Sequence, residues 1–252
     1  MSVLATIPAR AGSKGVKGKN MREINGLSLV DRVVKSALGV SKCDGGTKAV
    51  ISTDIEEIHL GRYKHLPPDT GRFIISHPRP PELCTDTALA WDVWQDAVKS
   101  AEKHFNRSWE YHLYLEPTSP CRTNEDIQEC IQFIINEQNS VCTVSESPIH
   151  PKKIFELVEN KFHPQHSFHQ FHIPVRYREK LEDGFYNNQP RQSYFKRYIK
   201  NGICYACTDK RMKTANTMLD PDTYFHIIDR PVINIDREED FLYAEALLDK
   251  RE

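Results

Sequence analysis

The stretch SVLATIPARAGSKGVKGKNMR, residues 2–22, decides the fold. Ser2–Ile7 is a short apolar run that ends at Pro8, which is typical of a buried strand. Residues 8–22 form a glycine- and lysine-rich loop, and the apolar spacing over Leu27–Leu38 predicts an amphipathic helix. A strand, a loop and a helix in this order place the loop at the carboxyl edge of a sheet, where open α/β folds bind ligands.

The loop has the composition of an anion site. It carries three glycines and five basic residues without an acid, in a chain whose formal net charge is −1. Glycines allow the backbone to approach a ligand, and turned N–H groups can hold oxyanions. The spacing fits neither the P-loop nor the dinucleotide fingerprint, because Asn20 follows Gly18-Lys19 and the glycines lie three apart. A polyphosphate is favoured, and a solvated basic turn is the alternative.

Outward from this stretch, strands and helices alternate. The order predicts a Rossmann-like α/β fold, with a mostly parallel sheet flanked by helices on both faces. Helices are expected to begin near Thr53-Asp54, at Thr85-Asp86 with Leu89 facing inward, and at Thr123 with Asp126 as its capping-box partner. A last helix runs through Phe241–Leu248. The further strands are expected at Ala49–Ser52, Arg72–Ser76, Tyr111–Leu115, Ser140–Ser145, Gly202–Thr208, Phe225–Ile228 and Val232–Ile235.

The alternation stops between residues 146 and 200, which are rich in His, Pro, Gln, Asn and Tyr. We therefore predict that residues 1–145 and 201–252 form one α/β domain. Residues 146–200 are predicted to be an arm inserted into it.

Composition excludes several classes of protein. The 252 residues are 39% hydrophobic, and no apolar run approaches the roughly 18 residues that a membrane span requires. Pro8 and Arg10 interrupt the apolar start, unlike a secretory signal. The near-neutral charge gives no overall attraction to nucleic acid or membranes. Seven cysteines, an odd number, indicate reduced thiols and a cytoplasmic protein. Cys204 and Cys207 lie three apart on a strand and thus on opposite faces, so structural thiols are favoured over a metal or redox pair.

Several motifs, in order, resemble those of the CMP-sialic acid synthetases, the N-acylneuraminate cytidylyltransferases. They span nearly the whole chain and are weakest at 146–190. The matching stretches are IPARAGSKGVKGKN (7–20), ISTD (51–54), RPPELCTDTA (79–88), LEPTSPCRTNEDI (115–127), RQ (191–192), NGICY (201–205) and NIDREEDFLYAE (234–245).

The resemblance implies the activity. CTP and a nonulosonic acid would give a CMP-sugar and pyrophosphate with Mg²⁺, in a homodimer whose arms complete each other's sugar pocket. Arg10 and Lys14 would hold the triphosphate, and they join Asp236 as the expected catalytic residues. The expected nucleotide-binding residues are Ala9, Arg10, Gly12, Ser13, Lys14, Asn20, Arg79, Asp86 and Glu116. The expected sugar-binding residues are Arg191, Gln192, Asn201 and Tyr205.

The expected metal site departs from the family pattern at two positions. Asp236 is the principal ligand candidate, but Asn234 stands where the family usually has a second aspartate. Glu116 stands where the family generally has glutamine. Our hypothesis is that Glu116 restores the lost carboxylate near the metal, with Asn234 as a neutral oxygen ligand. A contact of Glu116 with ribose or loop alone is the alternative.

Other readings remain open. A related nucleotidyltransferase could use GTP or another nonulosonate, and a non-catalytic nucleotide sensor is favoured by Asn234 alone. CMP-Kdo synthetase motifs and the G-x-G-T-R-L opening of sugar-1-phosphate nucleotidyltransferases are absent. Asn201-Gly202 alone reads as a turn. Histidines recur every third residue at His163, His166, His169 and His172. We expect a polar arm that contacts a partner subunit there rather than a metal site.

Overall fold

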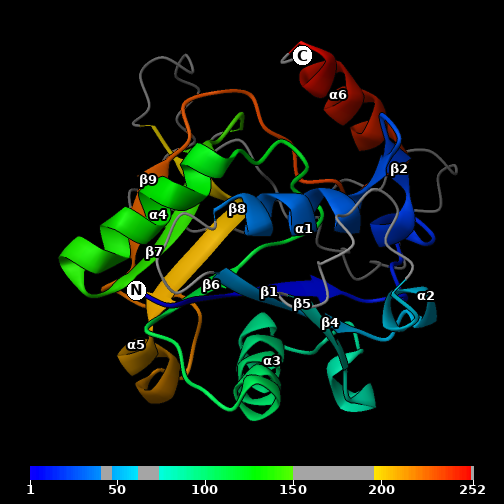
Figure 1. Ribbon diagram of the computed structural model, residues 1–252. Helices are drawn as coiled ribbons and strands as arrows, with labels where there is room; N and C mark the ends of the chain where they lie inside the picture. The colour runs from blue at the N-terminus through cyan, green and yellow to red at the C-terminus, as the bar shows by residue number, and fades with distance from the viewer. Residues whose placement is uncertain (41–46, 62–73, 150–195, 251–252) are drawn as a thin grey trace, which may run out of the picture. The chain divides into compact units, whose positions relative to one another are not determined.

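The computed structural model describes residues 1–40, 47–61, 74–149 and 196–250 (Figure 1). The chain divides into two compact units. One comprises Met1–Ser145 and Lys200–Glu252, and the other Glu146–Ile199. In the second unit the described ends are joined to each other, because the Ser147 N–H donates to the Arg197 carbonyl at 2.7 Å. Lys196 and Glu146 form an ion pair there at 2.8 Å.

The first unit is built on one sheet. Within the described residues the strand order is β5-β4-β1-β6-β8-β7-β9. Neighbours pair in parallel at β1–β4, β4–β5, β1–β6 and β7–β9, while β6 and β8 pair antiparallel. The strands are β1 (Val3–Ala9), β4 (Thr47–Thr53), β5 (Ile74–Pro78), β6 (Tyr111–Tyr114), β7 (Ser140–Glu146), β8 (Tyr198–Thr208) and β9 (Tyr224–Ile227). The mostly parallel α/β fold expected from the sequence is thus confirmed.

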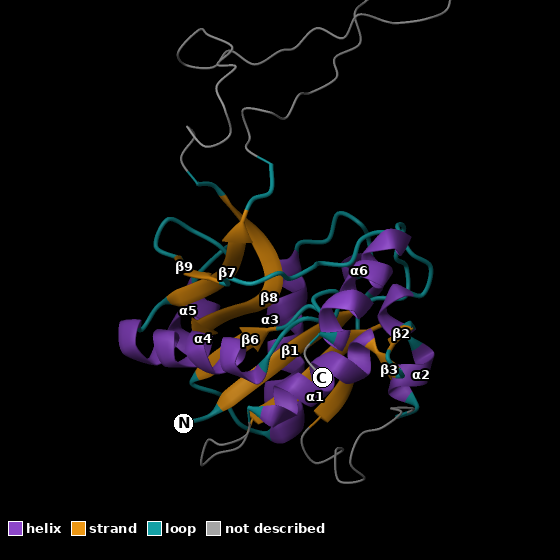
Figure 2. Ribbon diagram, turned by 90° about the horizontal axis from the view of Figure 1, so that it is seen from above, coloured by secondary structure: helices purple, strands orange, loops and turns teal. Residues whose placement is uncertain are grey.

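Helices cover both faces of the sheet (Figures 1 and 2). Successive side chains of a strand point to opposite faces, so Val3, Ala5 and Ile7 enter one hydrophobic core while Leu4 enters the other. Residues of α1 and α4 pack in the first core, and those of α3 pack in the second with Met212 of α5. The helices are α1 (Leu29–Gly39), α2 (Glu56–His59), α3 (Ala90–Phe105), α4 (Asn124–Glu137), α5 (Asp209–Thr214) and α6 (Glu238–Asp249).

Two local expectations are confirmed. The Thr123 hydroxyl accepts from the Asp126 N–H while the Asp126 carboxylate accepts from the Thr123 N–H, which is the capping box of α4. Cys204 lies in the α1/α4 core and Cys207 in the α3/α5 core, so these thiols do occupy opposite faces of β8. Trp91 and Trp94 of α3 are buried.

Other expectations are wrong. Helix α3 begins at Ala90 rather than at Asp86, and Leu89 is 63% exposed instead of inward. The reason is that the Asp86 carboxylate pairs with two cations rather than capping a helix. Val232–Ile235 forms no strand, because within the described residues it makes a single backbone–backbone hydrogen bond, from the Ile235 N–H to the Thr118 carbonyl, instead of a ladder.

Two boundaries also shift. The helix expected from Leu27 begins at Leu29 behind its Ser28 cap, because β2 (Glu23–Ile24) and β3 (Leu27–Ser28) form a small antiparallel ribbon. Helix α2 has Ile55 at its N-cap without a side-chain cap.

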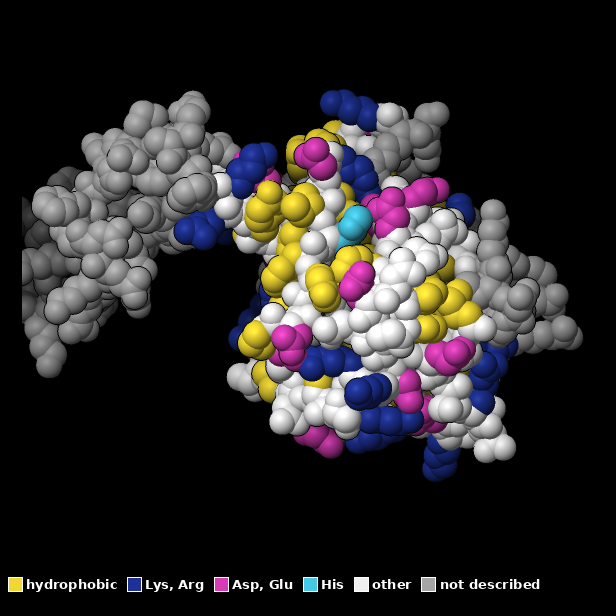
Figure 3. Space-filling view, turned by 90° about the vertical axis from the view of Figure 1, so that its left-hand side faces the viewer, with side chains coloured by type: hydrophobic (Ala, Val, Ile, Leu, Met, Phe, Trp, Pro, Cys, Tyr) yellow, Lys and Arg dark blue, Asp and Glu magenta, His cyan; other side chains and the backbone are white. Residues whose placement is uncertain are grey.

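The surface shown in Figure 3, which looks onto the side that carries β9 and α4, mixes charges of both signs. Hydrophobic side chains lie among them, and Tyr224, Phe225 and Ile227 of β9 are exposed. Among the described residues, no helix combines the length and apolar character that a bilayer span demands.

Candidate functional site

A cavity of about 540 Å³ opens at the carboxyl edge of the sheet. It is lined where four segments meet, namely 8–20 after β1, 79–93 after β5, 114–118 at the end of β6, and 234–236 before α6. The expected binding residues that line it are Arg10, Ser13, Lys14, Asn20, Arg79, Asp86, Glu116, Asn234 and Asp236. The fold therefore gathers residues that are more than 200 positions apart in the chain.

The basic loop is fixed by its own backbone and by the segment before α6. Gly18 has φ +62° and starts the 3₁₀ turn η1 (Lys19–Met21). The buried Asn20 side chain donates from Nδ2 to the Arg10 carbonyl at 2.8 Å. A Cβ at Gly15 would lie 2.2 Å from the Asp236 carbonyl oxygen, so only glycine permits this close approach.

Two cations of the loop share one carboxylate. Arg10 Nη2 lies 2.8 Å from Asp86 Oδ1, and Lys14 Nζ lies 2.6 Å from Asp86 Oδ2. The hydrogen bonds from Lys14 and then Arg10 lower the pKa of Asp86. The Lys14 side chain is 82% exposed, and the Arg10 side chain is 30% exposed. Exposed ion pairs contribute little to stability. A more highly charged anion can therefore displace Asp86 from both cations.

Arg79 supplies a third cation to the cavity. Its guanidinium donates from Nε to the Ser52 hydroxyl at 3.1 Å and from Nη2 to the Ser52 carbonyl at 2.7 Å. The residue is buried, and this burial lowers its pKa. A guanidinium still keeps its charge in proteins. The end of β4 thus holds the positive charge of Arg79 at the cavity through a neutral hydroxyl and a neutral carbonyl.

Glu116 forms part of the floor. Asn234 Nδ2 donates to Glu116 Oε2 at 3.3 Å. Burial raises the pKa of the Glu116 carboxyl, and the charge of Arg122 opposes that rise. A Cβ at Gly202, where φ is +70°, would lie 2.4 Å from Glu116 Oε2 and 2.6 Å from the Ser119 hydroxyl. At residue 202, β8 therefore approaches Glu116 and Ser119 more closely than any residue other than glycine would allow.

The oxygen donors suit a hard cation. Glu116 and Asp236 supply carboxylates to one cavity, and Asp236 is 77% exposed, with Lys19 Nζ 3.1 Å from its Oδ1. No group of three or more His, Cys, Asp or Glu in the described ranges could hold a metal alone. Mg²⁺ usually takes one or two carboxylates and completes its shell with phosphates and water. The residues present fit a cation that arrives with a polyphosphate.

Four expected residues lie apart from the cavity lining. Ala9 is buried in β1, and Gly12 is exposed on the loop. Tyr205 is 5% exposed in the α3/α5 core, with its ring beside Tyr114 at 6.2 Å. The Asn201 amide is buried, accepts from the Thr143 hydroxyl at 2.7 Å and donates to the Ser145 hydroxyl at 3.0 Å. Arg191, Gln192 and the histidines of 163–172 lie outside the described residues.

Lys19 was not among the expected site residues. Its Nζ donates to the Ile235 carbonyl at 2.6 Å, its side chain is 12% exposed, and it lines the cavity. In the sequence, Lys19 is one of five basic residues in the loop of residues 8–22, and no sequence feature separates it from the others. Only the 3₁₀ turn at Lys19–Met21 distinguishes it by directing it toward residues 235–236.

An open α/β sheet with a cationic, glycine-rich cavity at its carboxyl edge defines a nucleotide-binding α/β protein. A family model described as "Cytidylyltransferase" matches residues 4–198. The chain belongs to this cytidylyltransferase family and is an enzyme of that type, which confirms the resemblance to the CMP-sialic acid synthetases.

Three curated relatives illustrate the similarity. "Post-translational flagellin modification protein B" of Campylobacter coli is 27% identical over 99% of this chain and 96% of its own length. "CMP-N,N'-diacetyllegionaminic acid synthase" of Legionella pneumophila is 34% identical over 59% of each chain. "N-acylneuraminate cytidylyltransferase B" of Danio rerio is 28% identical over 96% of this chain. The chain covers about half of that fish protein (50%).

Two solved structures share the fold. A CMP:2-keto-3-deoxy-manno-octonic acid synthetase complexed with CTP has a TM-score of 0.62 at 14% identity and covers 100% of both chains. The 4-diphosphocytidyl-2C-methyl-D-erythritol synthase of Anaerococcus prevotii has a TM-score of 0.53 at 13% identity, over 98% of both chains. At these identities the likeness establishes the architecture only.

Proposed function

We propose that this protein transfers CMP from CTP to the anomeric hydroxyl of a nonulosonic acid, giving a CMP-sugar and pyrophosphate in a Mg²⁺-dependent reaction. The observation that carries the proposal is the convergence of Arg10, Lys14 and Arg79 with the carboxylates of Glu116 and Asp236 on one cavity. Such a mixture suits a metal-bound triphosphate. The names of the relatives, which include a neuraminate cytidylyltransferase and a legionaminic acid synthase, support a nonulosonate acceptor.

The residues divide the work by charge. Arg10 and Lys14 would leave Asp86 to bind the phosphates and neutralise the departing pyrophosphate. Ser13 and Gly15 lie on the same loop and line the cavity. Arg79 and Asn20, which also line the cavity, would bind the nucleotide. Catalysis of this kind consists mostly of positioning and charge stabilisation along an in-line attack on the α-phosphorus.

Glu116 and Asp236 would hold the metal, with Asn234 beside Glu116. When bound, Mg²⁺ would supply positive charge to the phosphate oxygens. The contact of 3.3 Å between Asn234 and Glu116 supports the hypothesis that Glu116 provides the carboxylate missing at position 234. We further propose a cytoplasmic homodimer, on the resemblance of the motifs, and light scattering checks its mass.

The test is pyrophosphate release with Mg²⁺, crossing CTP, GTP, UTP and ATP with N-acetylneuraminate, legionaminate, pseudaminate and Kdo. Release with CTP and a nonulosonate is expected, with the CMP-sugar identified by its mass. Release with another nucleotide would overturn the choice of base. Absence of release with every pair, in folded protein that binds CTP, would overturn the catalytic proposal.

Glu116→Gln tests the metal assignment. The Mg²⁺ concentration that gives half-maximal rate should rise about tenfold. Glu57→Gln, which removes an exposed carboxylate on α2, is the matched control and should leave it unchanged. A Glu116→Gln protein with the wild-type Mg²⁺ response would show that this carboxylate does not hold the metal.

A further inference from the structure

Arg122 lies behind the floor of the cavity and does not line it. The residue is 8% exposed, and its guanidinium faces backbone rather than solvent. Nη2 donates to the carbonyls of Glu116 at 2.7 Å and Gly202 at 3.1 Å, and Nε donates to the Ile203 carbonyl at 2.5 Å. One side chain therefore links the segment after β6 to residues 202 and 203 of β8.

This link replaces a missing part of the sheet. The β6–β8 ladder pairs residues 111–114 with 205–208 and goes no further. The preceding carbonyls of β8 accept hydrogen bonds from side chains, at Asn201 from the Ser119 hydroxyl and at Gly202 and Ile203 from Arg122. Buried backbone carbonyls need partners, so the turn of residues 116–122 continues the ladder with side-chain donors.

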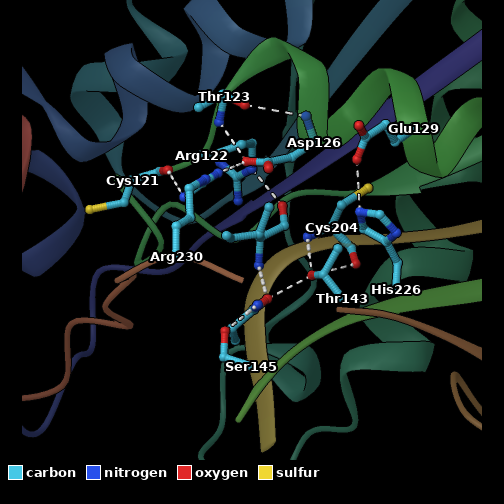
Figure 4. Close-up of polar contacts among 12 residues, drawn as sticks. Cys121, Arg122, Thr123, Asp126, Glu129, Thr143, Ser145, Cys204, His226 and Arg230 are labelled. Atoms are coloured by element: carbon cyan, nitrogen blue, oxygen red, sulfur yellow. Dashed lines mark hydrogen bonds and ion pairs between the residues drawn. The ribbon is translucent and has the colours of Figure 1, made fainter. Parts of the chain in front are cut away.

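An ion pair between Asp126 and Arg230 lies close to Arg122. Asp126 lies near Arg122, accepts from the Thr123 N–H and pairs with Arg230, which also donates to the Cys121 carbonyl at 3.1 Å (Figure 4). Burial lowers the pKa of Arg122 to about 10, and Asp126 and Glu116 oppose that fall. Arg122 therefore remains a cation at neutral pH, as its three carbonyl partners require.

We propose that Arg122 is a positioning residue, which sets the place of the Glu116 carboxylate by clamping its backbone against Gly202 and Ile203. The proposal rests on the function of Glu116 proposed above. Its chemistry is specific to a planar fork, since a lysine keeps the charge but cannot serve three carbonyls in that geometry. Arg122 would thus act on the bound nucleotide and cation without touching either.

The test compares Arg122→Lys with Arg230→Lys, a partly buried arginine beside it whose partners are Asp126 and the Cys121 carbonyl, not Glu116 or β8. CTP is titrated by calorimetry with Ca²⁺ present and with EDTA. The ratio of the two affinities measures what the cation contributes to nucleotide binding. Arg122→Lys should reduce that ratio about tenfold, while Arg230→Lys should leave it unchanged.

A double-mutant cycle separates positioning from general damage. In the Glu116→Gln background, Arg122→Lys should reduce the ratio no further, because the carboxylate that it positions is already gone. Equal loss of CTP affinity with Ca²⁺ and with EDTA, or independent effects that multiply in the double variant, would overturn the proposal.

Failure of the proposed function would look different, because wild-type protein would then gain no CTP affinity from Ca²⁺. In that case amide hydrogen exchange still tests the clamp. Exchange at Ile203 and Cys204 should be about tenfold faster in Arg122→Lys than in Arg230→Lys. Equal exchange in the two variants would overturn the positioning role.

Discussion

Arginine has opposite roles at two parts of the cavity, which are the exposed rim with Arg10, Lys14 and Asp86, and the floor formed by Glu116. On the rim, Arg10 shares the exposed Asp86 carboxylate with Lys14. Behind the floor, Arg122 is buried and donates to three backbone carbonyls. Exposed ion pairs are weak and replaceable, whereas a buried cation in a satisfied network is costly to disturb. The rim is therefore available to a ligand, whereas the floor is already ordered before a ligand binds.

The largest expected effect is on the floor. Arg122→Met should lower the free energy of unfolding by about 3–5 kcal/mol, because it leaves three buried carbonyls without their donor and removes the cation beside Glu116 and Asp126. Urea denaturation measures it. A loss below about 1 kcal/mol would mean that water enters and satisfies these groups, and the contrast with the rim would disappear.

Arg10→Ala should affect activity rather than stability. We expect kcat/KM for CTP to fall about 10²- to 10³-fold, because a cation directed at the developing charge is lost. The unfolding free energy should change by no more than about 0.5 kcal/mol. Steady-state kinetics and urea denaturation of the same preparation measure the two. A large loss of stability with little loss of rate would reverse the assignment of rim and floor.

Two glycines with positive φ provide a matched pair. Gly202→Ala on the floor introduces both strain and a clash with Glu116, whereas Gly18→Ala on the rim meets nothing within 4 Å. Strain alone should destabilise Gly18→Ala by about 1 kcal/mol, and Gly202→Ala should exceed it by at least about 1 kcal/mol. Thermal unfolding of both variants compares them. Equal losses would show that the floor yields as easily as the rim.

The smallest effect is expected at Asp86. Asp86→Asn should raise the affinity for pyrophosphate about two- to fivefold, because Arg10 and Lys14 no longer bind an internal carboxylate. Calorimetry at low and high salt measures it, and the gain should shrink with salt. Weaker binding would instead show that Asp86 itself contacts the ligand.

Local sequence signals predicted the fold where a nearby partner decides the structure. The capping box at Thr123 and Asp126 needs only residues three apart, and α4 begins where it predicts. The predictions of an inward-facing Leu89 and of a strand at Val232–Ile235 were wrong for the opposite reason. Asp86 is drawn to cations 70 or more residues away, and residues 234–236 are drawn to Glu116 and Lys19. An apolar spacing contains no information about such distant competitors.

The same distinction applies to the site. Motif resemblance identified nine of the residues that line the cavity, including Arg10, Arg79 and Glu116. It gave no reason to separate Lys19 from the other lysines, or to select Arg122 from its motif. Their roles depend on backbone carbonyls at positions 202, 203 and 235, which carry no side-chain signal.

The alternation of side chains across the sheet also distributes the thiols. Cys130 and Cys204 lie in the α1/α4 core, and Cys142 and Cys207 lie in the α3/α5 core. Burial raises the pKa of Cys142 to about 12 and also raises that of Cys207, so these thiols react with an alkylating reagent only when their core opens. Each core thus contains its own chemical reporters. Mass-resolved labelling at equal rates would identify one cooperative unit, and a faster pair would identify the layer that opens first.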